Sequence, residues 1–418
     1  MSESAEQQPA STAAALLRER DYVIYWLSRA AATLGVQIQA VAMGWQIYAL
    51  ARRTMSVPEA ALQVGFIGLV TFLPLLLLAL PAGESADRYE RKRILLFCLA
   101  GEIATVLFLF AAAHFGFASV GLLLCAAALF GISRSFFAPA NTAMGPMLVP
   151  RALLPRAIAW NSLAWQSASI LGPALGGILV ARSVETAFAA AGALYAASFL
   201  GLVLIRRSTK PVVQAGSRWT LIKEGLSYVW RQKIVFGAIS LDLFAVLLGG
   251  ATALLPVFAR DVLHVGAEGF GVLRAAPAIG ATLVGLYLAS SPIKRHAGPI
   301  MFWGVAVFGA ATIVFGISQI FWLSVVALAV LGGADMLSVF VRQTLVQLVT
   351  PDPMRGRVAA VSTLFISASN ELGEFESGVV ARFLGPVGAA IFGGVGALGV
   401  TALWAKLFPD LRKADRLE

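Results

Sequence analysis

The chain has 418 residues, of which 59% are hydrophobic and 13% are charged, and its mean hydropathy is +0.81. A soluble domain contains roughly 45–50% apolar residues, so this composition excludes a soluble protein and indicates an integral membrane protein. The formal net charge of +10 would also suit a nucleic-acid-binding protein, but the basic residues lie in short segments between apolar runs. That placement is typical of the loops of membrane proteins, and we therefore expect no nucleic-acid partner.

Continuous apolar runs of about 20 residues predict membrane-spanning helices and argue against the short alternating strands of a barrel. Splitting the chain at glycine, proline and charge clusters gives twelve spans, near residues 23–50, 62–82, 94–114, 117–148, 158–181, 186–205, 234–259, 268–290, 299–317, 321–349, 358–381 and 385–408. The predicted fold is all-α, a polytopic membrane protein with two six-helix halves. Cys98 and Cys125 lie inside apolar runs without metal-ligand spacing and are expected to be reduced.

The predicted organisation has five segments, with the two halves joined by the longest connection in the chain. They are a cytoplasmic N-terminal tail at 1–22, the N-terminal half at 23–205, a cytoplasmic linker at 206–233, the C-terminal half at 234–408 and a cytoplasmic C-terminal tail at 409–418. Most Lys and Arg residues fall on one side of this arrangement, which by the positive-inside rule places both termini in the cytoplasm. The first 20 residues contain no apolar core of a cleaved signal peptide, and we expect a multi-pass protein of the plasma (inner) membrane.

The connection between the second and third spans reads GESADRYERKR, from Gly83 to Arg93. The carboxylate of Asp87 can accept hydrogen bonds from a helix N-terminus in the other half, while the basic residues can bind anionic headgroups or simply set the topology. The segment resembles the GxxxDRxGRK loop that marks the major facilitator superfamily, with Glu90 where that family usually has glycine. The resemblance implies a conformational latch that closes the cytoplasmic side in the outward-facing state, formed by Gly83, Asp87, Arg88 and Arg91.

The fifth span contains LGPALGG, in which Gly172 and Gly176 are four residues apart on one helix face and Pro173 bends the helix. This segment, ending at Gly177, resembles the glycine-proline motif of the antiporter branch of the superfamily; plain helix packing is the alternative. Between about residues 20 and 412 the chain resembles the branch that contains the enterobactin exporter and macrolide efflux proteins. The segments ADRYERKR, ILGPALGG and TPDPMRGRV carry that resemblance.

In the linker, apolar residues recur at helical spacing and predict an amphipathic helix at the membrane surface, with a solvated linker helix as the alternative. These residues are Trp219, Ile222, Leu226, Val229 and Trp230.

An internal repeat relates the two halves, since sliding the chain by about 201 residues aligns the fourth and fifth spans with the tenth and eleventh. Gly131 falls on Gly332, and Gly177 falls on Gly378. Two halves with the same sense follow the parallel-repeat plan of transporters, in which the substrate lies between the halves near the membrane midplane. The sequence therefore predicts a central substrate cavity.

Ionisable side chains inside a bilayer cost about 2.5–3.5 kcal/mol each and require a partner or an aqueous cavity. By resemblance the first, fourth, seventh and tenth helices line the cavity, which assigns to it Arg29, Arg134, Asp242, Asp335 and Arg342. Because Arg134 and Asp335 are equivalent in the repeat, we predict an ion pair between them. This pair, or one of its members with the substrate, changes protonation or partner during transport; the alternative is a permanent pair that fixes the packing. Arg29 and Asp242 are a looser second pair, and Arg342 is a candidate for holding an anionic group.

Two further intramembrane charges and one set of aromatic residues complete the candidates. Glu102, in the third span, has no predicted role, and Arg274, in the eighth span, is a further intramembrane charge without an assigned role. The aromatic residues that could stack on a bulky cargo, or merely pack, are Trp45, Phe136, Phe137 and Phe244.

The eleventh span contains NELGEFESG, an unusual concentration of three glutamates in an apolar segment. At 100° per residue, Glu371 and Glu374 lie on one stripe of the helix, whereas Glu376 points to the opposite side. Two carboxyl groups so close in a dry site cannot both ionise easily, so we predict that Glu371 or Glu374 carries a proton. With Asp335 and Asp242 they form the predicted proton-coupling set.

The function expected from these features is a proton-coupled antiporter that exports a siderophore, drug or metabolite by alternating access. One alternative is a lysolipid or amphiphile transporter of the same fold, and another is a non-transporting receptor or scaffold. No phosphate loop, metal-ligand cluster or nucleophile elbow occurs, and GGVGALG in the last span lacks a dinucleotide-binding context, so we expect neither an enzyme nor a cofactor. The expected partners of a monomeric protein are the small-molecule substrate, protons and anionic headgroups on the cytoplasmic side.

Overall fold

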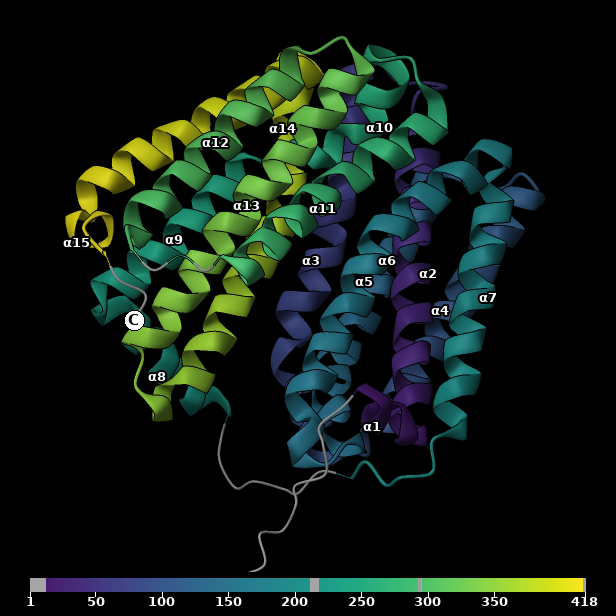
Figure 1. Ribbon diagram of the computed structural model, residues 1–418. Coiled ribbons are helices and arrows are strands. Elements are labelled where there is room, and N and C mark those ends of the chain that lie inside the picture. Colours follow the sequence, from purple (N-terminus) through teal and green to yellow (C-terminus); the bar gives the residue numbers. More distant parts are fainter. Residues whose placement is uncertain (1–12, 211–217, 292, 294, 416–418) are drawn as a thin grey trace, which may run out of the picture.

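The computed structural model describes residues 13–210, 218–291, 293 and 295–415, and every regular element in these ranges is a helix (Figure 1). The N-terminal half contains α1 (Ala13–Arg18), α2 (Arg20–Ala51), α3 (Val57–Arg88), α4 (Arg91–His114), α5 (Val120–Met144), the short helices η1 (Gly145–Leu148) and η2 (Arg151–Leu153), α6 (Leu154–Arg182) and α7 (Val184–Leu204). The linker helix is α8 (Arg218–Arg231). The C-terminal half contains α9 (Lys233–Leu248), η3 (Ala251–Leu254), α10 (Leu255–Val257), the π-helical turn η4 (Phe258–Val262), α11 (Gly266–Ser290), α12 (Ala297–Ile317), α13 (Phe321–Val349), α14 (Asp352–Leu407) and α15 (Pro409–Arg412).

The expectation of twelve membrane helices in two halves is confirmed. Ten helices in the described ranges are long and apolar enough to cross a membrane. One of them, within α14, holds two spans that meet at Gly385, whose φ of +73° interrupts the helix just before Pro386. The remaining span is α2, whose 32 residues give a length of about 48 Å but whose sequence is more polar.

The seventh predicted span, 234–259, corresponds to the apolar segment Lys233–Val262, but this segment is not one continuous helix. Helix α9 ends at Leu248, and the chain continues through the short turns η3, α10 and η4. The break occurs at Gly249 and Gly250, where the chain passes directly against α14: a Cβ added at Gly250 would lie 2.3 Å from the carbonyl oxygen of Gly373. Close backbone contact of this kind requires glycine and replaces a regular helical turn.

The loop predicted between Gly83 and Arg93 is also mostly helical. Helix α3 continues to Arg88, and only Tyr89 and Glu90 separate it from α4. Glu90 adopts φ −62° and ψ 117°, an extended conformation that any residue can take, so a glutamate fits where the family usually has glycine. Its carboxylate pairs with Arg93 at 2.9 Å.

Helix α8 is docked on the C-terminal half. Glu224 forms an ion pair with Arg357 of α14, and the hydroxyl of Tyr228 donates to the carbonyl of Val349 at 3.1 Å. Val229 is buried, while Leu226 and Trp230 are exposed. The side chains of Trp219 and Ile222 lie outside the described residues, and the membrane-surface role of the helix stays a prediction.

The halves pack through two pairs of helices, α3 against α14 and α6 against α11. A Cβ added at Gly65 of α3 would lie 2.8 Å from the Cα of Gly378 of α14, and one added at Gly177 of α6 would lie 2.7 Å from the Cα of Gly271 of α11. Gly177 and Gly378 are the positions that the internal repeat aligns. The repeat therefore appears in the structure as two equivalent backbone contacts, one on each side of the interface.

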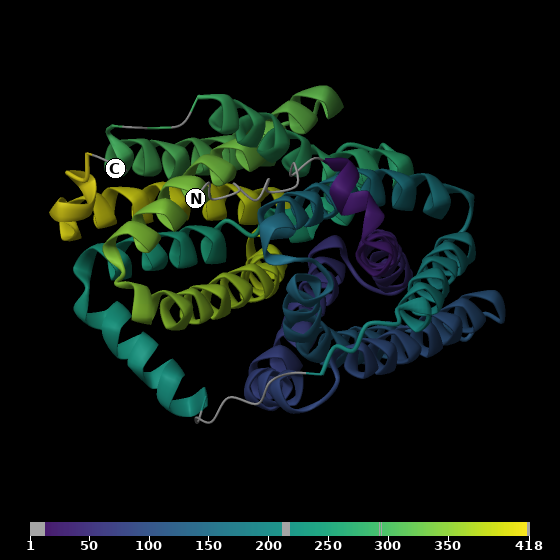
Figure 2. The same cartoon turned by 60° about the horizontal axis from the view of Figure 1, so that its bottom comes forward.

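The halves converge at the end of the bundle opposite the linker. There the hydroxyl of Tyr48 and the guanidinium of Arg52, both from the end of α2, bind the carboxylate of Asp261 in η4. Trp45 stacks on Phe270 nearby, with ring centroids 6.0 Å apart. Figure 2, with the linker end turned forward, shows the helices of the two halves as separate groups. We call these the closed end and the linker end.

Candidate functional site

A cavity of about 500 Å³ lies between the two halves and receives side chains from both. Its N-terminal wall comes from α2, α3, α4, α5 and α6, and its C-terminal wall comes from the turns after α9, from α11 and from α14. Gly44 and Pro256 line it toward the closed end, while Asn141 and Thr142 line it toward the linker end. The cavity lies where the parallel repeat predicts the substrate site.

Charged side chains from both halves meet in this cavity. Arg134 of α5 donates to the carboxylate of Glu371 of α14 at 2.6 Å, which is a direct ion pair across the interface. Glu374, one turn further along α14, interacts electrostatically with Glu371, Arg134 and Arg274. All four residues line the cavity. Two acids and two bases thus form one network, which we call the central charge cluster.

Helix α14 reaches the centre of the molecule because α3 carries glycine where the two helices cross. A Cβ added at Gly68 would lie 2.3 Å from the carbonyl oxygen of Glu371 and 2.8 Å from the Cβ of Glu374. A larger residue would push α14 away from α3 and move both carboxylates out of reach of α5. Gly68 of α3 therefore positions Glu371 and Glu374 in the central charge cluster, because it lets the backbones of α3 and α14 come into contact.

Arg29 adds a fifth charged group to the cavity wall. It lies one turn from Tyr25 and interacts electrostatically with both Tyr22 and Tyr25. The two tyrosine hydroxyls are fixed in turn, since that of Tyr22 donates to the carbonyl of Ala157 at 2.8 Å and that of Tyr25 to the carbonyl of Asn141 at 2.7 Å. These bonds join α2 to α5 and α6 beside the cavity.

A second charged cluster lies inside the C-terminal half. Arg342 of α13 donates to the carboxylate of Asp242 of α9, with side-chain exposures of 2% and 7%. Asp335, also on α13, interacts electrostatically with both. We call these three residues the buried triad; it contains two acids and one base.

The predicted pairs between Arg134 and Asp335 and between Arg29 and Asp242 are wrong for this structure. Helices α5 and α13 are equivalent in the repeat but are not neighbours, because α14 packs on α3 between them and presents Glu371 to Arg134. Asp242 is occupied by Arg342. The prediction that Arg342 holds an anionic ligand is also wrong for this structure. Its guanidinium pairs with Asp242 and is enclosed in the buried triad.

The glutamates of the eleventh span separate as the helical spacing indicates. Glu371 and Glu374 line the cavity, whereas Glu376 accepts a hydrogen bond from the neighbouring Ser377 at 3.4 Å and does not line it. Phe375 packs on Phe66 of α3, with ring centroids 5.4 Å apart. The acidic stripe therefore faces the site, and its role in proton transfer stays a prediction.

Of the four aromatic candidates, Phe137 lines the cavity. Phe136 lines a different pocket on the outer side of α5. Trp45 packs on Phe270 at the closed end, and Phe244 packs on Trp404. Phe137 is thus the one of the four that this conformation places beside a central cargo.

The latch segment contacts its own half in this conformation. Arg88 pairs with Glu84 at 2.6 Å, and Arg91 lies beside Asp87 and donates to the sulfur of Met147. Lys92 donates to the carbonyls of Val203 and Ile205, which end α7. Lys92 therefore fixes a helix end, in addition to any effect on topology. The latch function of Gly83, Asp87, Arg88 and Arg91 stays a prediction.

The glycine-proline segment contacts two helices. A Cβ added at Gly172 would lie 2.4 Å from the Cβ of Gln37, and one at Gly176 would lie 3.0 Å from the Cβ of Val41, both on α2. The carbonyl of Pro173 and the backbone of Gly177 meet Gly271 of α11 instead. One face of this segment therefore packs α6 on α2 of its own half, and an adjacent face packs α6 on α11 of the other half.

Sequence reasoning left Arg274 without a role, and it missed Gln166 and the closing contact of Asp261. The amide of Gln166 on α6 donates to the hydroxyl of Thr282 and the carbonyl of Ala278 on α11, at 2.5 and 3.1 Å. The available signal was a polar residue in an apolar span, but only the fold shows that it faces the other half. In the described part of the chain, no three His, Cys, Asp or Glu side chains form a possible metal site.

Twelve membrane helices in two repeated halves around a central charged cavity define a secondary transporter fold of the major facilitator superfamily. Solved structures with this arrangement include a bacterial homologue of the human lysosomal transporter Spinster in an inward-facing, unoccupied conformation (TM-score 0.71, 15% identity, 94% of this chain and 96% of that one). Another is a POT family transporter in complex with 5-aminolevulinic acid (TM-score 0.74, 11% identity, 94% and 96%). At these identities the likeness establishes the fold.

The chain belongs to the transmembrane secretion effector family, whose profile matches residues 11–417. It is similar to the enterobactin exporter EntS of Citrobacter koseri, with 27% identity over 401 residues that cover 93% of this chain and 92% of the relative. It is also similar to EntS of Escherichia coli O1:K1, with 26% identity over the same shares. The protein is therefore a multi-pass membrane transporter of this superfamily.

Proposed function

We propose that the protein is a proton-coupled antiporter that exports a small organic molecule by alternating access. The observation that carries this proposal is the ion pair between Arg134 and Glu371, which joins the two halves across the cavity beside Glu374 and Arg274. A charge pair across a moving interface has to break when the halves separate. Its two groups are then available to a proton or to a cargo, which couples binding to movement.

Competition for the same carboxylates would produce the exchange. A cargo amine and a proton both bind Glu371 or Glu374, and each excludes the other, so the two are carried in alternation. An acidic group of the cargo would instead compete with Glu371 for Arg134. Asp335 and Asp242 of the buried triad are a second place where a proton can replace an ion pair. Arg29 and Phe137 would complete the cargo contacts once the halves move.

We assign the linker end and both termini to the cytoplasm and the closed end to the outside of an inner membrane, following the distribution of basic residues. The structure would then represent the inward-facing state, in which cargo enters from the cytoplasm. The latch segment would close this end in the outward-facing state and rest on anionic headgroups meanwhile. The proposed transporter acts as a monomer, because each chain contains a complete cavity.

Two observations suggest candidate classes of cargo, the similarity to EntS and an apolar groove on the N-terminal half. The similar EntS proteins are exporters of enterobactin, and a siderophore is accordingly one candidate for this chain, together with drugs and metabolites. An amphiphile that enters from the membrane is the second candidate, favoured by an apolar groove on the outside of the N-terminal half. A receptor or scaffold without transport has no use for the central charge cluster.

Uptake into inside-out vesicles driven by a pH gradient tests the proposal, with a panel of siderophores and antibiotics as cargo. The double variant Glu371→Gln, Glu374→Gln should lose the dependence of uptake on the gradient, while the matched variant Glu376→Gln should keep it. Gradient-driven uptake that is unchanged in the double variant would exclude these two residues as proton carriers. Uptake that no gradient stimulates would exclude proton coupling altogether.

A further inference from the structure

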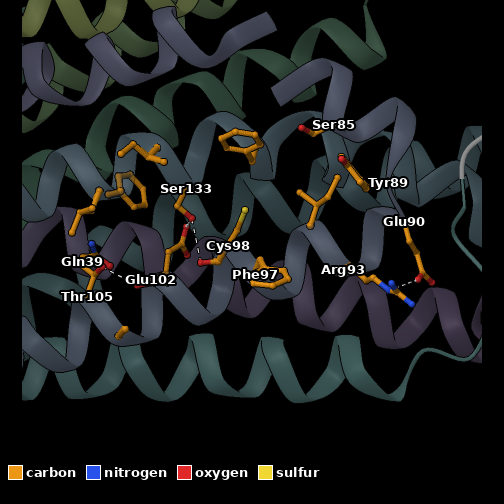
Figure 3. A pocket seen from close by; sticks show the side chains of 17 residues that line it. Gln39, Ser85, Tyr89, Glu90, Arg93, Phe97, Cys98, Glu102, Thr105 and Ser133 are labelled. Carbon is orange, nitrogen blue, oxygen red and sulfur yellow. Dashed lines mark hydrogen bonds and ion pairs between the residues drawn. The ribbon is translucent and has the colours of Figure 1, made fainter. Parts of the chain in front are cut away.

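A groove of about 790 Å³ runs along the outer surface of the N-terminal half between α3, α4 and α5 (Figure 3). Its volume falls within the range of about 300–1,000 Å³ that is typical of small-molecule sites. Phe97, which lines it, is 82% exposed, and Leu129 and Ile132 are also exposed. In a membrane-spanning chain such side chains face lipid, so the groove is open to the bilayer.

The groove is apolar except at its two ends. Tyr89, Glu90 and Arg93 lie at the end nearer the linker, and Glu102 lies near the other end, midway along α4 (Figure 3). The wall also carries the aromatic rings of Phe97, Phe130 and Phe136 among its apolar side chains. Such rings can stack on a flat hydrophobic molecule.

Glu102 is a buried carboxyl group without a cationic partner. It is 5% exposed and accepts a hydrogen bond from the hydroxyl of Ser133 at 2.8 Å. Within the described part of the chain, no Lys or Arg forms an ion pair with it. A carboxyl group at this depth is costly unless a ligand or partner compensates it, and the groove leads directly to it.

Glu102 also belongs to the wall of the central cavity. Together with Gln39 and Phe130 it lines both the groove and the cavity. Gln39 is held in this wall by the hydroxyl of Tyr195, which donates to its side-chain oxygen at 2.8 Å. The two spaces are therefore separated by a few side chains rather than by a helix.

We propose that the groove binds a hydrophobic aromatic amine from the membrane, with the amine on Glu102, and that such a cargo enters the cavity there. This inference rests on the proposed transport function and names a cargo class and an entrance for it. The amine would supply the cationic hydrogen-bond donor that Glu102 lacks. Displacement of the Phe130 and Gln39 side chains would then bring the amine to the cavity, where Glu371 and Glu374 can receive it.

The two cysteines of the chain provide an occupancy assay. Cys98 is buried in the wall of the groove, so its alkylation reports how readily that wall opens to the reagent, whereas Cys125 is exposed elsewhere on α5 and serves as an internal control. Purified protein is treated with N-ethylmaleimide in the presence of 1-pyrenemethylamine or of 1-pyrenemethanol, which has the same apolar body without the amine. The extent of alkylation at each cysteine is followed by mass spectrometry, and thermal unfolding with each compound gives a second readout.

We expect the amine to slow alkylation of Cys98 about ten-fold at a concentration where the alcohol has little effect, because hydrogen bonds to charged groups are the stronger ones. Cys125 should react equally throughout. In Glu102→Gln the two compounds should become equivalent. Gly101, which lines the groove, has no atom within 4 Å of an added Cβ, so Gly101→Leu should fill the groove and abolish protection. Gly121→Leu, equally open but outside the groove, should not.

Three results would overturn the inference, and they differ from a failure of transport. Equal protection by amine and alcohol in the unaltered protein would show that any apolar guest binds and that Glu102 plays no part. The absence of protection and of any thermal shift would show that the groove is no site. Amine uptake into vesicles that is equal in Gly101→Leu and Gly121→Leu would exclude the groove as an entrance. Protection does not require transport, so loss of gradient-driven uptake with protection intact would refute the antiporter alone.

Discussion

The buried triad predicts an unequal response to neutralising its three members. Arg342 and Asp242 have side-chain exposures of only 2% and 7%, and removing one partner of a buried ion pair costs about 3–5 kcal/mol. Arg342→Met leaves two carboxylates facing each other without a cation, so its cost should reach the upper part of that range. Asp242→Asn leaves Arg342 beside Asp335, which can replace the lost partner, and should cost less than about 2 kcal/mol. Asp335→Asn keeps the pair and should cost close to nothing.

Thermal unfolding in detergent measures this order. At an average unfolding entropy of about 2 cal/mol/K per residue, a loss of 4–5 kcal/mol lowers the Tm of a 418-residue chain by about 5 °C. The fully neutral variant Asp242→Asn, Asp335→Asn, Arg342→Met is the matched control and should recover most of the loss, because no uncompensated charge remains. A Tm of Arg342→Met within 1 °C of the unaltered protein, or a larger loss in Asp335→Asn, would contradict the reasoning.

Asp335 also allows stability and coupling to be separated. Because Asp335→Asn should fold normally, its transport can be compared directly with that of the unaltered protein. Gradient-driven uptake should fall if Asp335 carries or relays a proton, and full uptake would remove it from the coupling set.

Two further predictions concern the contacts between the halves. Gly378→Val should abolish transport in the vesicle assay, because its Cβ would lie 2.7 Å from the Cα of Gly65 and neither backbone can move aside. The control Gly399→Ala, on the same helix with open space around it, should transport normally. Asp261→Asn should weaken the contact of Tyr48 and Arg52 with position 261 at the closed end. A membrane-impermeant maleimide added from that end should then label a cysteine introduced at Ala253, which lines the cavity, more extensively. Unchanged labelling would show that Tyr48 and Arg52 do not control access there.

Much of the fold could be predicted from the sequence because hydrophobic spans and the internal repeat depend on local composition and spacing. The repeat identified Gly177 and Gly378 as equivalent, and the structure places both in backbone contacts between the halves. The stripe of Glu371 and Glu374 follows from helical spacing alone. The break of the seventh span could not be foreseen, because it depends on how closely Gly250 approaches α14.

The partners of the charged residues could be predicted less well. Pseudo-symmetry relates positions and does not say which side chains touch, so Arg134 was assigned to Asp335 although Glu371 stands beside it. The role of Glu102 was also invisible, since its importance arises from a groove formed by three helices. Contacts between distant segments are set by packing, and a single sequence does not determine them.

The two glycine contacts between the halves have a mechanical consequence. At Gly65 with Gly378 and at Gly177 with Gly271, backbone meets backbone and no side chain is interposed. Rotation of one half about a line through these two points would therefore require no change of rotamer at either point. Elsewhere, tightly packed side chains resist sliding because they must leave one set of positions before they reach another. The interface thus combines two glycine contacts that permit rotation with ion pairs that oppose it, those of Arg134 with Glu371 and of Arg52 with Asp261. Glycine permits the movement of the halves, and charged side chains control it.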